Sequence, residues 1–377
     1  MVVEGLNILL TRARELNLFN GVVLGANEIS VSHLQFADDS IIFCEADWGE
    51  VVNIKRILRC FEMISGLRIN YHKSVISGIG VQNDLLADFA GRLNCKCQKL
   101  PFKYLGLPLG ANPGRLKTWK PIVDRFKVKL ASWKRRFLSL PERLTLIKAV
   151  LSSLLIYYLS LFKMPEGVAK ELEKIQTAFL WGGSVIKSKL HMVKWSEVTR
   201  SVIKGGLGIK SLQDVNAYLL LRWWWRFGRE ENLLWKKVVC GKYNIQGSKW
   251  YPNTEASQKH SWLWKDILCV ANFNPALHSF FVSNTFILVA NGARTLFWED
   301  KWVGVRCLKD EFPRLYSISP NKLKSVKQVI ELRRTLHEWE ECFNRVLRAW
   351  EKEEVARLVT LVNNIRELRV DKVDVFC

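Results

Sequence analysis

The sequence predicts an α+β protein whose first third mixes helices with antiparallel strands and whose remainder is mostly helical. Three observations support this class. The chain of 377 residues is 49% hydrophobic and 25% charged, which is the balance of a globular protein with about two or three domains. Between residues 20 and 110, short strand-like apolar segments lie between turn residues. From about residue 115 onward, apolar residues recur with the period of a helix.

The first 110 residues are predicted to form a series of short elements. The sequence FADD (36–39) separates two apolar stretches, so we expect a hairpin with Asp38 and Asp39 at its tip. Gly66 is placed to end a helix. The expected elements, in chain order, are a helix ending near residue 20, strands at 21–25, 28–36 and 40–44, a helix at 49–65, strands at 67–70 and 74–79, a helix at 84–93 and extended segments within 99–110.

Beyond residue 115 three apolar stripes predict a helical bundle. Pro165 is placed to open the third helix, and Gly182 with Gly183 to close it. The stripes are Trp119, Val123, Phe126, Leu130 and Trp133; Leu144, Ile147, Leu151, Leu154, Leu155 and Tyr158; and Val168, Leu172, Ile175 and Phe179. Lysines and arginines occupy the opposite face of the first stripe, so one face of the bundle is basic.

The stretch from residue 184 to about 340 is rich in tryptophan, and a final amphipathic helix or helix pair is expected from about residue 336. Apolar neighbours accompany most of the tryptophans, so we expect these side chains in the core. The segment from Arg222 to Arg226 is a secondary candidate for holding a nucleic-acid backbone.

The charge of the chain points to a polyanionic partner. The formal net charge is +21, and residues 96–150 hold fourteen Lys and Arg side chains against only Asp124 and Glu142. An excess of this size opposes compaction unless a polyanion offsets it. Nucleic acid is the first expectation, and an anionic membrane surface is the second.

Cysteine usage and the N-terminal sequence predict an intracellular protein, in the nucleus or the cytoplasm. Nine cysteines without a pairing pattern indicate free thiols, and the close pair Cys95 and Cys97 lacks a second pair at zinc spacing. Glu4 lies early and no small-residue cleavage site follows, so no signal peptide is expected. The longest apolar run, 150–162, is too short to span a bilayer and is expected to form a buried helix. Nucleic acid is therefore preferred to a membrane as the partner.

Two adjacent carboxylates at a hairpin tip suit a divalent metal. Mg²⁺ takes oxygen ligands and often completes its shell with substrate phosphates. Because side chains alternate along a strand, consecutive aspartates reach the same metal only where the backbone turns. Asp38 is therefore the better ligand candidate, and Asp39 is a second ligand or a supporting acceptor. The alternative is a solvated Asp-Asp turn.

The sequence FADDSIIFC (36–44) resembles the F/Y-A-D-D hairpin of reverse transcriptases, and its neighbours resemble, in order, plant non-LTR (LINE-type) retrotransposon polymerases. The similar segments are EGLNILL (4–10), the palm element GLRINYHKS (66–74), the primer-grip strand FKYLGLPLG (102–110), the thumb (132–165) ending in FLWGG (179–183), and the connector segments KGGLGIKSL (204–212) and LFWEDKWVG (296–304). The resemblance covers nearly the whole chain. It implies the C-terminal half of a palm at 1–110, a basic helical thumb at 111–183, a tryptophan-rich connector at 184–335 and a C-terminal helical segment at 336–377.

The resemblance also implies functional roles. Asp38 and Asp39 correspond to catalytic carboxylates that hold Mg²⁺ or Mn²⁺. Lys73 lies near the incoming dNTP, with a solvated lysine at a strand end as the equal alternative. The primer is held by Tyr104, Leu105 and Gly106. The template–primer backbone is followed by Lys127, Lys129, Lys134, Arg135 and Arg136, for which the alternative is an exposed helix face. The implied partners are an RNA template and a DNA primer.

Several elements of the polymerase family are not found in this sequence. In that family another catalytic aspartate and the finger segments precede the helix that resembles residues 4–10. An endonuclease and a C-terminal Cys/His segment are also not found. The resemblance therefore predicts an RNA-directed DNA polymerase fragment that does not polymerise alone. The alternative is a non-enzymatic remnant that binds nucleic acid through its basic thumb face. No constellation of spaced acidic residues predicts hydrolysis of RNA.

Overall fold

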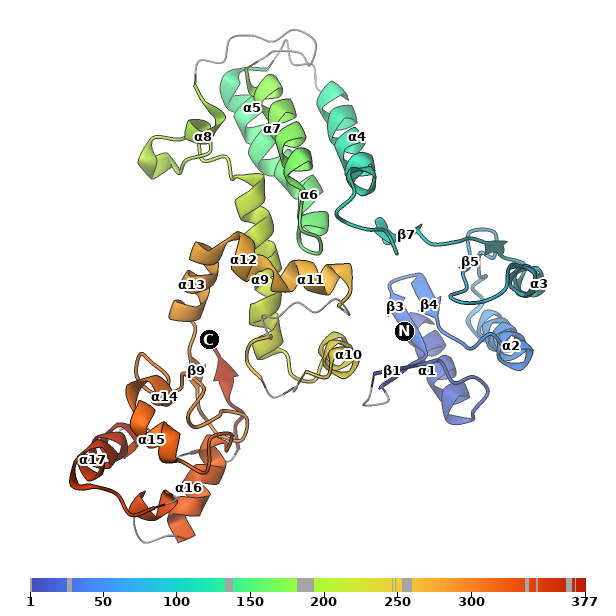
Figure 1. Ribbon diagram of the computed structural model, residues 1–377. Coiled ribbons are helices and arrows are strands. Elements are labelled where there is room, and N and C mark those ends of the chain that lie inside the picture. The colour runs from blue at the N-terminus through green and yellow to red at the C-terminus, as the bar shows by residue number, and fades with distance from the viewer. Residues whose placement is uncertain are drawn as a thin grey trace. The chain divides into compact units, whose positions relative to one another are not determined.

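The structure, a computed structural model, confirms the α+β class (Figure 1). It describes residues 2–25, 29–132, 138–181, 193–245, 247, 249–252, 260–335, 339–343, 345–363, 368–369 and 371–377. The chain forms two compact units. Unit 1 comprises Met1–Leu219, Lys237–Ile245 and Ser257–Asp266, and unit 2 comprises Leu220–Lys236, Gln246–Ala256 and Ile267–Cys377. Within the described residues, no helix is long and apolar enough to cross a lipid bilayer.

The first part of unit 1 consists of helices and two-stranded sheets. The pairs β1–β2, β3–β4 and β7–β8 are antiparallel, and β5–β6 is parallel. In chain order the elements are α1 (Val2–Glu15), β1 (Val22–Leu24), β2 (Ile29–Val31), β3 (His33–Phe36), β4 (Asp39–Ile42), α2 (Trp48–Ser65), β5 (Val75–Ile76), α3 (Asn83–Leu93), β6 (Lys96–Cys97), β7 (Phe102–Tyr104) and β8 (Leu107–Leu109).

Helix α2 matches its sequence prediction at both ends. The Asp47 side chain accepts a hydrogen bond from the Glu50 N–H, and Gly66 ends the helix with a φ of 71°. The strand predicted at 67–70 is wrong. The N–H of Ile69 donates instead to the Glu62 carboxylate at 2.8 Å, so a side chain of α2 takes the place of a neighbouring strand. The long strand expected at 28–36 is also interrupted, at Ser32, between β2 and β3.

The second part of unit 1 is helical. Helix α4 packs against α6 and α7, and α5 packs against α7 (Figure 1). The expected stripe of α4 is buried at Trp119, Val123, Phe126 and Leu130, which confirms its orientation, whereas Trp133 lies outside the described residues. The elements are α4 (Leu116–Ser132), α5 (Leu140–Leu146), the π-helical turn η2 (Ile147–Leu151), α6 (Ser152–Leu159), α7 (Glu166–Leu180), α8 (Trp195–Val198), the 3₁₀ turn η3 (Val202–Lys204), α9 (Leu212–Arg229), α10 (Leu234–Tyr243) and α11 (Trp262–Leu268).

The loop between α6 and α7 is held by two side chains from much later in the chain. The Asn216 amide donates to the carbonyls of Leu159 and Phe162 at 2.7 and 2.8 Å, and its oxygen accepts from the Met164 N–H at 2.8 Å. Asp266 accepts from the Lys163 N–H at 2.9 Å. These bonds satisfy backbone groups that the turn leaves without helical partners.

Unit 2 is built around tryptophan side chains, as the sequence predicts. Trp250, Trp298 and Trp302 are buried in one cluster, whereas Trp350 is 45% exposed. Besides the end of α9, its elements are α12 (Val270–Phe273), α13 (Pro275–Asn284), β9 (Ile287–Leu288), α14 (Leu308–Glu311), α15 (Pro313–Ile318), α16 (Val326–Thr335), the 3₁₀ turn η4 (Trp339–Cys342), α17 (Ala349–Asn363) and β10 (Val375–Phe376).

The C-terminal strand β10 is part of this core. It pairs with β9, and the Phe376 ring stacks on Trp250 at a centroid distance of 5.9 Å. Just before it, the buried Asp374 carboxylate accepts four hydrogen bonds. The donors are the N–H groups of Ala290, Gly292 and Thr295 and the Thr295 hydroxyl, at 2.8, 2.8, 3.2 and 2.7 Å.

Replacing Asp266 with asparagine should stabilise unit 1 at neutral pH. Burial raises the pKa of Asp266 to about 6, against the opposing effect of Lys163. As pH falls from about 6 towards the unperturbed value of 3.8, the folded state binds a proton before the unfolded chain does, and stability therefore rises. Asp266→Asn keeps an acceptor oxygen without the buried charge. We expect about 1 kcal/mol of stabilisation at pH 7 and none near pH 4.

The measurement is thermal unfolding followed by tryptophan fluorescence at the two pH values. Asp88→Asn removes the same charge from an exposed position on α3 and is the control. An equal gain from both variants would show that net charge, and not burial of Asp266, is responsible.

Replacing Asp374 with alanine should destabilise unit 2. Four donors lose their acceptor, and buried unsatisfied donors are costly, so we expect a loss of about 3 kcal/mol. Limited proteolysis of unit 2 across a urea series measures the change. Asp371→Ala, at an exposed position three residues earlier, is the control and should change protease sensitivity little. Matching sensitivities of the two variants would contradict the assigned role of Asp374.

Candidate nucleic-acid interface

The FADD segment forms the expected tight hairpin. Phe36 pairs with Asp39, so Ala37 and Asp38 make a two-residue turn between β3 and β4. Ala37 adopts a φ of 52°, a left-handed conformation that costs a residue with a Cβ about 1 kcal/mol. Asp38 and Asp39 are both exposed. The turn therefore presents the two carboxylates to solvent at the end of the hairpin.

The predicted primer-grip residues form a second hairpin of the same length. Tyr104 pairs with Leu107, and the turn residues Leu105 and Gly106 have φ values of 48° and 84°. Two positive φ values are typical of a type I′ turn, for which glycine is favoured in the second position. The Tyr158 hydroxyl, from α6, donates to the Gly106 carbonyl at 3.1 Å. This bond fastens the hairpin to the helical part of unit 1.

The charge at the tip of the first hairpin acts on one side chain of the second. Burial raises the pKa of the Tyr104 phenol, and the charge of Asp39 and the phenol of Tyr157 raise it further. Tyr104 and Asp39 therefore lie within electrostatic reach, although 65 residues separate them along the chain. Tyr157 of α6 is 46% exposed beside them. One predicted metal ligand thus lies within electrostatic reach of one predicted primer-binding residue.

The hydrogen bonds of the Lys73 backbone are local. It lies in a turn after α2, where its N–H donates to the carbonyl and the side-chain oxygen of Asn70, both at 3.1 Å. Its side chain is exposed. Among the described residues, no hydrogen bond or ion pair joins it to Asp38 or Asp39.

The carboxylates at the hairpin tip fit a metal ion that is shared with a substrate. Within the described part of the chain, no group of three or more His, Cys, Asp or Glu side chains could hold a metal ion. Mg²⁺, however, is commonly bound by one or two carboxylates together with substrate phosphates. Asp38 and Asp39 offer oxygen ligands of this kind, but not a closed protein site.

The two described lysines of the predicted basic cluster lie on opposite flanks of α4. Residues two positions apart on an α-helix are separated by about 200° around its axis, so Lys127 and Lys129 do not face one direction. Lys127 points to α7, where its ammonium group contacts Glu171 at 2.7 Å. The other members, Lys134, Arg135 and Arg136, lie outside the described residues.

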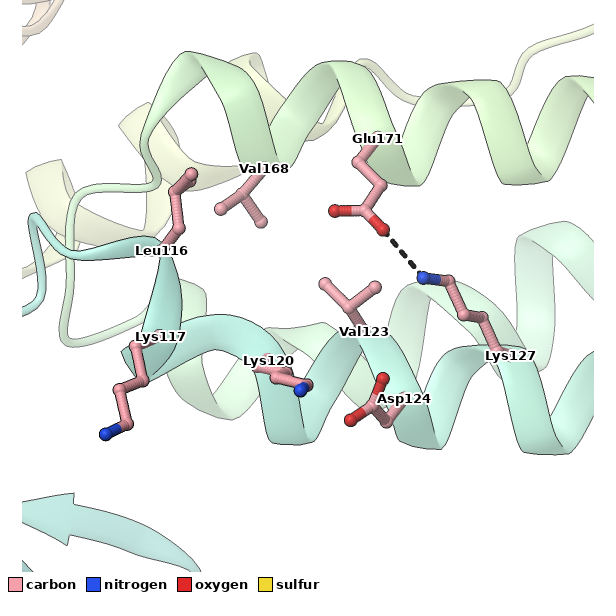
Figure 2. Close-up of a pocket in the computed structure, with 8 residues that line it drawn as sticks. All are labelled: Leu116, Lys117, Lys120, Val123, Asp124, Lys127, Val168 and Glu171. Atoms are coloured by element: carbon pink, nitrogen blue, oxygen red, sulfur yellow. Dashed lines mark hydrogen bonds and ion pairs between the residues drawn. The ribbon is translucent and has the colours of Figure 1, made fainter.

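Lys127 borders a groove of about 320 Å³ between α4 and α7, shown in Figure 2. Its lining residues are Leu116, Lys117, Lys120, Val123, Asp124 and Lys127 from α4, and Val168 and Glu171 from α7. Lys117, Lys120 and Lys127 lie on one flank of α4. The sequence indicates this, because they are three, seven and ten positions apart, and residues at these spacings lie on nearly the same side of a helix. Sequence reasoning counted Lys117 and Lys120 only as part of the basic run and missed the Glu171 contact.

Releasing Lys127 from Glu171 should strengthen nucleic-acid binding. Glu171→Gln removes the carboxylate that occupies the lysine, so we expect about threefold tighter binding of an RNA–DNA hybrid at low salt. Fluorescence anisotropy measures the affinity. Glu166→Gln is the matched control, because Glu166 lies on the same helix and is paired with Lys170 at 3.7 Å. If both variants gain equally, net charge alone sets the affinity and the groove has no part in it.

No known protein-family model matches the chain. One similar protein, from Arabidopsis thaliana, is named as a putative ribonuclease H protein. It is 32% identical over 191 residues, which cover 49% of this chain and 29% of that protein. An uncharacterized mitochondrial protein of Arabidopsis thaliana is 23% identical over 151 residues, which cover 39% of this chain and 91% of that protein. The chain thus spans less than a third of the first relative's length, and both relatives are plant proteins.

Proposed function

We propose that this chain is part of the reverse transcriptase of a plant retroelement of the non-LTR, LINE type. In this proposal the FADD hairpin supplies two carboxylates of an RNA-directed DNA polymerase, and the basic helices hold the template–primer duplex. The ordered resemblance of the sequence to these polymerases supports the proposal. The plant origin of the similar proteins agrees with it.

The observation that carries the proposal is the electrostatic influence of one hairpin tip on the other hairpin. A polymerase must hold the primer terminus next to the metal-bound nucleotide, because phosphoryl transfer depends on positioning and on neutralising charge. The Asp39 carboxylate lies within electrostatic reach of the Tyr104 phenol, which burial and this carboxylate perturb. Leu105 and Ala37 both hold left-handed backbone conformations, and strain of this kind gathers at functional sites.

Each residue has a defined task in this proposal. Asp38 and Asp39 would hold Mg²⁺ or Mn²⁺ jointly with the triphosphate of a dNTP, and the metal would supply charge neutralisation there. Tyr104, Leu105 and Gly106 would position the primer strand. Tyr158 keeps that hairpin in place through Gly106. Lys73 would reach the triphosphate only if its turn approaches the substrate once it is bound.

The name of the first relative refers to a different chemistry. It describes a ribonuclease H protein, and this chain covers 29% of that protein. We propose no hydrolysis of RNA for this chain, because its sequence shows no constellation of spaced acidic residues that such chemistry would need.

Metal-directed cleavage of the polypeptide tests the hairpin site directly. Fe²⁺ replaces Mg²⁺ in such sites and, with ascorbate and peroxide, cuts nearby backbone. With an RNA template, a DNA primer and a dNTP bound, we expect cleavage within residues 36–42. We expect Asp38→Ala to remove this cleavage while leaving hybrid binding unchanged. Uniform cleavage, or cleavage that persists in Asp38→Ala, would contradict the proposed metal site.

The same template–primer tests the basic face and the catalytic competence of the chain. Hybrid affinity should fall steeply with salt, and replacing Lys134, Arg135 and Arg136 with glutamine should reduce the salt slope by about two to three. An unchanged slope would contradict the thumb assignment.

Primer extension with Mg²⁺ or Mn²⁺ is expected to be absent for this chain alone. Extension that Asp38→Ala abolishes would overturn that expectation and establish the polymerase.

A further inference from the structure

The C-terminal half of α9 interleaves arginines with tryptophans in the sequence LLLRWWWRFG (219–228). Trp224 faces the core of unit 2: it is 1% exposed, and its indole N–H donates to the Ile267 carbonyl at 2.9 Å. Arg222 and Arg229 are exposed. They are seven residues apart, so two helical turns, about 10 Å, separate them on one side of the helix. This outer side lies away from the buried stripe.

Arg226, between them, has a structural role. Its guanidinium group lies 4.4 Å from the centroid of Trp223 and 5.3 Å from that of Trp235. Its Nε donates to the Glu230 carboxylate at 2.9 Å, and the other oxygen of that carboxylate accepts from the Trp235 indole at 2.7 Å. Burial opposes the charge of Glu230, but these hydrogen bonds lower its pKa on balance. The network neutralises Arg226 and fixes the outer side of α9 against α10.

Arg222 and Arg229 are held less closely than Arg226, although the charge of Arg222 also helps to lower the pKa of Glu230. Within the described part of the chain, neither forms an ion pair with a carboxylate. The central carbon of the Arg229 guanidinium lies 4.8 Å from the centroid of the Trp225 ring, and the Arg229 side chain is exposed. The Arg222 side chain stands two turns earlier on the same exposed side.

We propose that this side of α9 is a second nucleic-acid-binding surface, specific for a single strand. A guanidinium plane whose inner face rests on an indole can stack an unpaired base on its outer face. Its N–H groups bind phosphate at the same time. Arg229 therefore takes a base and a phosphate, and Arg222 takes a phosphate of the same strand. Paired bases in a duplex do not present their faces, so the surface favours single-stranded RNA over a hybrid. The surface acts independently of the proposed polymerase site.

Binding of a fluorescent single-stranded RNA to the full chain tests the proposal. We expect Arg222→Gln with Arg229→Gln to weaken binding about tenfold and to reduce the salt slope by about 1.4, the value for two phosphates on a single strand. Binding of an RNA–DNA hybrid should change less than about twofold, since the thumb is intact. Arg306→Gln with Lys372→Gln removes the same charge from exposed positions of unit 2 and is the control.

Two further comparisons keep the outcome decisive. Arg222→Lys with Arg229→Lys should keep the salt slope but lose the preference for RNA with bases over an abasic strand, because lysine offers no plane for stacking. Equal thermal unfolding of all variants shows that the fold is intact. If the glutamine pair and the control pair bind single-stranded RNA equally, the proposal is overturned. Loss of hybrid binding in parallel with single-strand binding would also overturn it. Selective binding of single-stranded DNA would show that this side of α9 binds a single strand and that the strand is DNA, which would overturn the assignment to RNA.

Discussion

The arrangement of unit 1 depends on the hydrogen bonds that Asn216 makes to the loop between α6 and α7. Backbone groups that leave a helix must find partners, and here one buried amide satisfies three of them. Tyr158 is next to this loop, and its hydroxyl holds the Gly106 carbonyl. The position of the β7–β8 hairpin is therefore tied, through a single turn of chain, to a side chain more than fifty residues later. This explains why unit 1 continues past α7 to Leu219.

Local signals made most elements of the fold predictable from the sequence. Apolar periodicity located α2, α4 and α7, Gly66 marked the end of α2, and the FADD segment marked a hairpin, because each signal acts within a few residues. The errors have long-range or side-chain causes. Residues 67–70 form no strand because the Glu62 carboxylate pairs with the Ile69 N–H. Strand β10 was not predicted, because its partner β9 lies almost ninety residues earlier and Asp374 anchors it there.

In the candidate site, too, features with local causes were predictable from the sequence and features with long-range causes were not. The turn that exposes Asp38 and Asp39 follows from four consecutive residues, so the sequence was sufficient to place it. The approach of Asp39 to Tyr104 joins two hairpins and could be expected only from the order of the resembling segments. Lys127 and Lys129 face different sides of α4, because residues two positions apart on a helix do not share a face. Their closeness in the sequence nevertheless led to the prediction of a single cluster. The Glu171 partner of Lys127 lies on another helix, α7, so the residue pattern of α4 alone could not predict this ion pair.

The ion pairs of the two surfaces change how the net charge of +21 should be understood. Lys127 and Arg226 both lie in strongly basic segments, yet each is held by a carboxylate, Glu171 or Glu230. A cation engaged in this way contributes less to counterion release when a polyanion binds, because part of its charge is already compensated. Its role is to orient neighbouring groups. Affinity should then depend on nearby cations that form no ion pair, as Arg222 and Arg229 are within the described residues, although the charge of Arg222 still acts on Glu230. The net charge alone thus overestimates how many cations are available to bind a polyanion. The positions of the acidic residues determine which cations remain available.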